Sequence, residues 1–195
     1  MDGQGPGATT PVIGQACMTT PDSLPIRLGQ AFHRLMEFAE HLPAQTMPEA
    51  DWHRGRWGRL LAPYALPREA CAEVGACAVQ IVSAPDMRDL LGLDTAQAVA
   101  WAEREWPDAS GGWIRPDRVV WLPDCQPVRI IDFKWRCLFS ELADYAAQLS
   151  RYQQALQEKA AGHAISSWIL TADQEVWMLN EGRLVHCQVA GRPAS

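Results

Sequence analysis

Trp113-Ile-Arg-Pro-Asp117-Arg-Val-Val-Trp121 and Arg129-Ile-Ile-Asp132-Phe-Lys134 are two neighbouring apolar segments, and each carries one aspartate. Side chains alternate between the two faces of a strand, so we expect Asp132 and Lys134 on one face and Ile131 and Phe133 on the other. The apolar run that ends at Ile131 favours a strand inside the sheet. Two carboxylates and a lysine at one sheet edge can hold Mg²⁺ and activate a water against a phosphodiester.

The order and spacing of these residues favour a functional site over a solvated strand. An Asp-x-Lys pair by itself is common on solvated strands. Here it follows an earlier aspartate, and Gln148-x-x-x-Tyr152 comes fourteen residues after Lys134, with one helical turn between glutamine and tyrosine. Charges at the end of a buried strand are costly unless they have a partner, and a divalent metal is a natural one.

An amphipathic helix is predicted near the start of the chain. His33 and Glu37 share one of its faces at i and i+4. Its apolar stripe consists of Leu28, Phe32, Leu35, Met36, Ala39 and Leu42. A histidine on such a helix is more often structural or solvated than a ligand.

Together these segments resemble the nuclease domain of RecB- and AddA-type helicase–nucleases, in the PD-(D/E)XK superfamily. The resemblance covers residues 26–188 and is sharpest over 111–156. It implies an α/β fold with a restriction-endonuclease-like core, in which helices flank a central mixed sheet and an N-terminal helical extension precedes it. We expect residues 1–24 to form a flexible tail and residues 25–190 a single RecB-like nuclease domain.

The resemblance also implies a site. Asp117, Asp132 and Lys134 match the catalytic residues, and the two aspartates would bind the metal together with the backbone carbonyl of Phe133. His33 matches a metal-ligating histidine. Lys134 would orient the water or stabilise charge on the phosphate, and would act as a base only if its pKa were strongly lowered.

Three further residues follow from the same resemblance. The segment Ala100–Pro107 is similar to the family segment that carries a glutamate before the hairpin, and Glu105 matches this residue better than Glu103, as a further candidate ligand. Gln148 and Tyr152 would support the active-site edge or contact the DNA backbone. The expected cofactor is Mg²⁺, or Mn²⁺ because imidazole shifts the preference slightly.

Two positions depart from the family pattern. Pro116 stands directly before Asp117, and a proline removes a backbone donor, so the strand should kink there or lie at an edge. Trp135 follows Lys134, where the family has a small residue. Its ring could stack on a nucleobase.

Composition limits the function classes. The chain has 195 residues, 48% of them hydrophobic, and a net charge of −6. It is long enough for one core, and it contains no run of apolar residues long enough to span a membrane and no secretory signal. We therefore expect a cytoplasmic protein with no membrane partner. Its acidity argues against broad nucleic-acid binding, although Arg54, Arg56, Arg59 and Arg68 form a basic stretch and Arg115, Arg118, Arg129 and Arg136 surround the site.

The six cysteines (Cys17, Cys71, Cys77, Cys125, Cys137 and Cys187) are scattered without a Cys-x-x-Cys pair. This spacing fits neither a zinc ribbon nor an iron–sulfur cluster, so no such cluster is expected. The thiols are expected to be reduced.

Strands are expected near 97–105, 113–121 and 127–134. An exposed, irregular or helical connector over 52–61 should follow the first helix. A further helix should carry Gln148, and strands should follow at 165–170, 175–179 and 183–187, the last two joined by a turn at Asn180-Glu-Gly182.

The resemblance implies a metal-dependent deoxyribonuclease that acts on single strands or DNA ends in DNA repair or recombination. A separate UvrD-like helicase, or a complex like AddAB or RecBCD, would be its partner. Exonuclease and endonuclease action are both compatible with the motif, as are DNA and RNA substrates. One alternative is a catalytically silent nuclease-like module for DNA binding or assembly. Another is an interaction protein with an exposed patch of Trp52, Trp57 and Trp113.

Overall fold

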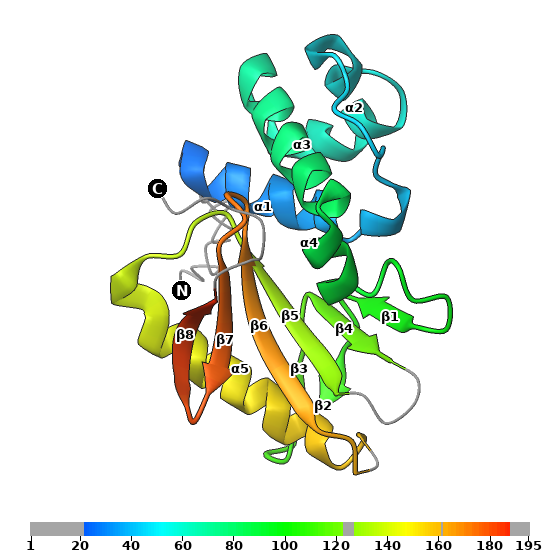
Figure 1. Ribbon diagram of the computed structural model, residues 1–195. Coiled ribbons are helices and arrows are strands. Elements are labelled where there is room, and N and C mark those ends of the chain that lie inside the picture. Colours follow the sequence, from blue (N-terminus) through cyan, green and yellow to red (C-terminus); the bar gives the residue numbers. More distant parts are fainter. Residues whose placement is uncertain (1–21, 123–126, 161, 188–195) are drawn as a thin grey trace, which may run out of the picture.

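A six-stranded mixed sheet forms the centre of the molecule, and helices cover both of its faces (Figure 1). The computed structural model describes residues 22–122, 127–160 and 162–187. The strand order is β1-β4-β5-β6-β7-β8. Their bounds are β1 Val99–Ala102, β4 Arg118–Trp121, β5 Val128–Lys134, β6 Ile165–Thr171, β7 Val176–Asn180 and β8 Arg183–Cys187. The fold is thus α/β, as the sequence predicts.

Strand β5 lies inside the sheet, as its apolar run predicts. It pairs antiparallel with β4 and parallel with β6, and helix α5 (Leu142–Gln157) makes the crossover between the two parallel strands. Ile130 and Ile131 are both fully buried, Ile130 in the core on the α5 side and Ile131 in the core under the other helices. A strand that is covered on both faces must be apolar in its middle, so its charged residues lie towards its two ends, with Arg129 near the start and Asp132 and Lys134 near the finish.

Helices α1, α3 and α4 cover the face opposite α5 (Figure 1). They span Leu24–Met36, Arg68–Ser83 and Pro85–Leu90, and the short helix α2 spans Gly55–Leu61. Short 3-10 helices lie at Ala39–His41, Glu49–His53, Ala62–Tyr64 and Phe139–Glu141. The helices α1 to α4 precede the first strand, as the expected N-terminal extension does. Among the described residues no helix is both long and apolar enough to cross a membrane.

The predicted strand over 113–121 is interrupted. Its first part, β3 (Trp113–Ile114), pairs with β2 (Trp106–Pro107) in a separate two-stranded sheet, and its second part is β4. Pro116 lies in the break, where it has no backbone N–H to donate to a sheet ladder. The strand expected near 97–105 is likewise shorter, since β1 ends at Ala102. The turn at 180–182 is confirmed, because it joins β7 to β8 with positive φ at Glu181 and Gly182.

The connector after the first helix is helical, and part of it is buried. Trp52 is 1% exposed and lies against Gly75 of α3, where a Cβ atom would come within 2.2 Å of the indole. A glycine on α3 therefore makes the room that this ring occupies. The expected flexible tail falls mostly outside the described residues.

Candidate metal-binding and catalytic site

Two neighbouring strands bring the two aspartates together. The β4–β5 ladder pairs Arg118 with Ile131, so the next position in this register sets Asp117 opposite Asp132. Oδ2 of Asp117 accepts a hydrogen bond of 2.6 Å from the backbone N of Phe133. Asp117 directly precedes β4, and its side chain accepts the hydrogen bond that a backbone carbonyl would accept if β4 extended to this position.

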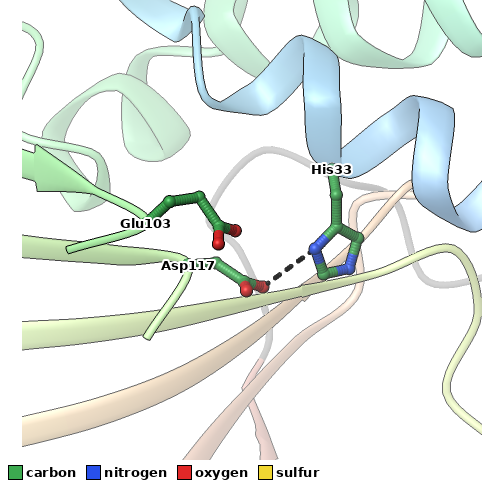
Figure 2. Close-up of side chains that lie close together, drawn as sticks. All are labelled: His33, Glu103 and Asp117. Atoms are coloured by element: carbon green, nitrogen blue, oxygen red, sulfur yellow. Dashed lines mark ion pairs between the residues drawn. The ribbon is translucent and has the colours of Figure 1, made fainter. Parts of the chain in front are cut away.

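His33 reaches the same place from helix α1 (Figure 2). Its Nδ1 lies 3.3 Å from Asp117 Oδ2, and its side chain is 28% exposed. Helix α1 packs on β5 through Phe32, whose ring meets that of Phe133 edge to face at 6.3 Å. The apolar stripe of the helix therefore orients His33 towards the sheet edge, as the sequence predicts.

Glu103 completes a three-residue acceptor set. One ligand atom each of His33, Glu103 and Asp117 lies within 4.8 Å of the others, and Figure 2 shows the three side chains converging. Glu103 comes directly after β1, and its backbone N donates to the carbonyl of Asp117 at 3.0 Å. It has a φ of 52°, in the left-handed region that is unfavourable for a residue with a Cβ. Its Oε2 also contacts Arg115 Nε at 2.9 Å.

This geometry corrects the preference for Glu105. The side chain of Glu105 is exposed and is not part of the three-residue set, whereas Glu103 is. The family pattern favoured Glu105 because it stands directly before an apolar residue and a proline, and both glutamates fall within the strand expected near 97–105. The signal that separates them is strand pairing, because Ala102 pairs with Arg118 and the next position puts Glu103 opposite Asp117.

Asp132 and Lys134 form a second group beside this set. Lys134 Nζ lies 2.5 Å from Asp132 Oδ2 and 4.8 Å from the centre of the Tyr145 ring. Nε2 of Gln148 donates to Asp132 Oδ1 at 3.2 Å and to the hydroxyl oxygen of Tyr152 at 2.7 Å. The glutamine and the tyrosine both belong to α5, so the predicted helical turn brings them to Asp132 on β5.

Burial makes the charged form of Asp132 unfavourable. Its side chain is 2% exposed, and apart from the Lys134 ammonium its Oδ2 makes no hydrogen bond of regular geometry with a described residue. Burial, and then the charge of Asp117, raise the pKa of Asp132 to about 6. Burial lowers the pKa of Lys134, but the adjacent Asp132 carboxylate raises it more, so the pKa lies above its ordinary value. Lys134 is therefore a cation, and the lowered pKa that a general base needs is not present.

The other two ligand candidates have shifted proton affinities as well. Burial lowers the pKa of His33, but the hydrogen bond and the charge of Asp117 outweigh it and raise the value overall. Burial and the charge of Asp117 raise the pKa of Glu103. Both residues hold their protons more tightly than usual, so a cation that binds here must compete with protons.

The carbonyl of Phe133 is directed to the same edge. The N–H and C=O of one strand residue point to the same neighbour, and the N–H of Phe133 points to Asp117. The carbonyl of Lys134 points the other way, where it accepts from the backbone N of Ala172. The predicted backbone ligand thus lies on the Asp117 side of β5.

Several expected neighbours of the site have other roles. Glu37 forms an ion pair with Arg34. Arg118 is 1% exposed and binds the carbonyl of Leu91 and the carboxylate of Glu40, while Arg129 contacts Asp89. These two arginines hold the sheet to the helical layer and are not free to bind phosphate.

The tryptophan expectations have different outcomes. Trp135 packs partly against the core under α1, with its ring 5.9 Å from that of Phe32, and keeps part of its surface exposed, so stacking on a nucleobase stays a prediction. The patch of Trp52, Trp57 and Trp113 does not form, because Trp52 is buried. The hypothesis that the chain is an interaction protein with an exposed tryptophan patch therefore loses its main support.

The chain matches no known protein-family model and no curated protein. The function must therefore be inferred from the site.

The described cysteines are free thiols: Cys71, Cys77, Cys137 and Cys187. Cys17 and Cys125 lie outside the described residues.

Proposed function

We propose that the chain is a metal-dependent deoxyribonuclease of the PD-(D/E)XK type that hydrolyses phosphodiester bonds in DNA. One observation carries the proposal. A nitrogen and two carboxylate donors gather within 4.8 Å of one another, directly beside a buried aspartate that is paired with a lysine.

The donor set suits a hard divalent cation. Carboxylate and carbonyl oxygens with one imidazole nitrogen are typical ligands of Mg²⁺ and Mn²⁺. Asp117 and His33, with Glu103 or the carbonyl of Phe133, would hold it. Asp132, the second aspartate ligand that the resemblance implies, lies outside this three-residue set with its Oδ2 against Lys134, and would join it when the cation binds. When bound, such a cation lowers the pKa of a water and offsets charge on the scissile phosphate.

Lys134 supplies a fixed positive charge at the site. Its pKa is raised, so it donates hydrogen bonds to the attacking water or to a phosphate oxygen and does not take a proton. Gln148 fixes one oxygen of Asp132, and Tyr152 fixes Gln148 in turn. These contacts hold the carboxylate in one orientation.

The test is cleavage of 5′-labelled single-stranded DNA with Mg²⁺, with Mn²⁺ and with a chelator. Cleavage that needs the metal and disappears in Lys134→Ala supports the proposal. DNA binding without cleavage under any metal would instead identify the silent nuclease-like module. Duplex ends and RNA of the same sequence, assayed in parallel, define the substrate. A separate helicase or an AddAB-like complex remains a proposed partner, to be sought by co-purification.

A further inference from the structure

A basic segment lies next to the helix that carries His33. Residues 52–68 contain four arginines and no aspartate or glutamate, in a chain whose net charge is −6. Arg54 precedes α2, and Arg56 and Arg59 lie on it. Helix α2 contacts α1, so this positive segment adjoins the helix that carries His33 (Figure 1).

Arginines and aromatic rings alternate at the contact between the two helices. The Arg56 guanidinium lies 5.2 Å from the ring centre of Phe38 and 5.0 Å from that of Trp57. The Arg34 guanidinium lies 5.0 Å from the Phe38 ring, and Arg34 directly follows His33. Arg34, Phe38, Arg56 and Trp57 are called the arginine–aromatic cluster below.

The arginines of α2 and the residue before it differ from several arginines near the site. Arg115, Arg118 and Arg129 are each neutralised by a carboxylate, and Arg34 is paired with Glu37. Arg54, Arg56 and Arg59 are exposed and form no ion pair with any residue in the described ranges. Three unpaired guanidinium groups are therefore gathered within six residues at α2.

We propose that α2 and the arginine–aromatic cluster bind single-stranded nucleic acid and lead it to the site. The inference rests on the proposed function, because it names the surface that the nuclease substrate would occupy. Unpaired guanidinium groups match a phosphate backbone in charge and geometry. Guanidinium groups lie over the half-buried rings of Phe38 and Trp57, and bases, which only an unpaired strand exposes, can stack on such an arginine–aromatic layer.

Arg34 directly follows His33 on α1, so the arginine–aromatic cluster adjoins the helix that carries one residue of the three-residue acceptor set. A nucleic-acid strand bound along α2 would reach this set across α1.

The test measures binding apart from cleavage. Fluorescence anisotropy follows a labelled 15-nucleotide oligo(dT) in a chelator, over a series of salt concentrations. In Arg54→Gln/Arg59→Gln we expect an affinity loss of about tenfold or more at low salt. Because two phosphate contacts are removed, the slope of log K against log salt should fall by about 1.4, at roughly 0.7 per contact for single strands.

The matched control is Lys159→Gln/Arg183→Gln, which also removes two positive charges from exposed positions. Lys159 lies just after α5, and Arg183 is the first residue of β8. This variant should bind like the wild-type protein. Arg56→Gln should also weaken binding, and it should do so more at high salt than the Arg54/Arg59 pair, because its ring contacts are lost as well. Circular dichroism confirms that each variant is folded.

Equal affinity of the wild-type protein and Arg54→Gln/Arg59→Gln would overturn the inference, and so would equal losses in the control variant. Competition by poly-glutamate as effective as that by oligo(dT) would also overturn it and point to an acidic protein segment. Binding through α2 without any cleavage would contradict the proposed nuclease function while leaving this surface in place.

Discussion

The backbone N–H of Phe133 donates to the carboxylate of Asp117, with 2.6 Å between the two atoms. Phe133 stands between Asp132 and Lys134 on β5, so this one bond joins the two halves of the site. On one side lie His33 and Glu103, and on the other the Asp132–Lys134 pair. A movement of the Asp117 carboxylate towards a ligand would therefore stretch or break its hydrogen bond to the backbone of β5.

Glu103→Gln should weaken Mg²⁺ or Mn²⁺ binding by about tenfold or more, because it removes one anionic ligand from the acceptor set. Glu105→Gln is the matched control, since it makes the same change on an exposed side chain two residues away. Isothermal titration with each metal distinguishes them. A larger loss in the Glu105 variant would identify Glu105 as the ligand and contradict the three-residue set.

Lys134→Ala should abolish cleavage, by about 10²-fold or more, and keep metal binding, because the ammonium acts on water and phosphate and is not a metal ligand. Asp132→Ala should lose both properties. Calorimetric metal titration of the two variants, alongside the cleavage assay, separates the roles. If the lysine variant lost as much metal affinity as the aspartate variant, this division of labour would be wrong.

Asp132→Asn should stabilise the metal-free protein at neutral pH. The folded-state pKa of Asp132 is about 6, above its ordinary value of 3.8, so the folded state binds this proton more tightly than the unfolded state does. The buried carboxylate therefore costs stability above pH 6, and the cost disappears as the pH falls towards 4. At 1.36 kcal/mol per pKa unit the cost is roughly 3 kcal/mol at most.

Urea unfolding of both proteins from pH 4 to pH 8 measures this effect. The gain of the asparagine variant over the wild-type protein should be largest at pH 7 to 8 and should vanish near pH 4. A gain that did not depend on pH would mean that the aspartate charge is not its source.

Much of the site followed from the sequence because it depends on local periodicity. Alternation along β5 predicts the Asp132–Lys134 pair, and helical spacing predicts that Gln148 and Tyr152 act together. The apolar stripe of α1 predicts which side of the helix packs on the sheet, whereas the position of His33 at the site was an expectation of the family resemblance. Each of these relations is fixed within one element.

What could not be predicted depends on long-range pairing. The choice of Glu103 over Glu105 requires the β1–β4 register and a left-handed backbone at a residue that is not glycine. The burial of Trp52 requires Gly75, which lies on another helix. Pro116 predicted a break in the strand, but the pairing of β3 with β2 in a second sheet is a tertiary result.

Metal affinity should rise steeply with pH between about 5.5 and 7.5. Protons compete with the cation at His33 and Glu103, whose pKa values are raised, and at Asp132, whose pKa is about 6. Titration in two buffers of different ionisation enthalpy counts the protons released on binding. Release should be largest at the acidic end and decline as the pH rises, and a constant proton count would contradict the competition.

Gln148→Ala should reduce cleavage by about 10- to 100-fold while leaving Lys134 in place, because Gln148 holds one oxygen of Asp132 and outer contacts of this kind have effects of that size. Tyr152→Phe removes only the hydroxyl that accepts from Gln148, so the glutamine can still bind Asp132. We therefore expect a loss of no more than a few fold from the tyrosine variant. Steady-state cleavage at saturating metal compares the two, and the loss should appear in kcat because the carboxylate is misdirected during reaction. A tyrosine variant as impaired as Gln148→Ala would mean that Tyr152 touches the substrate directly.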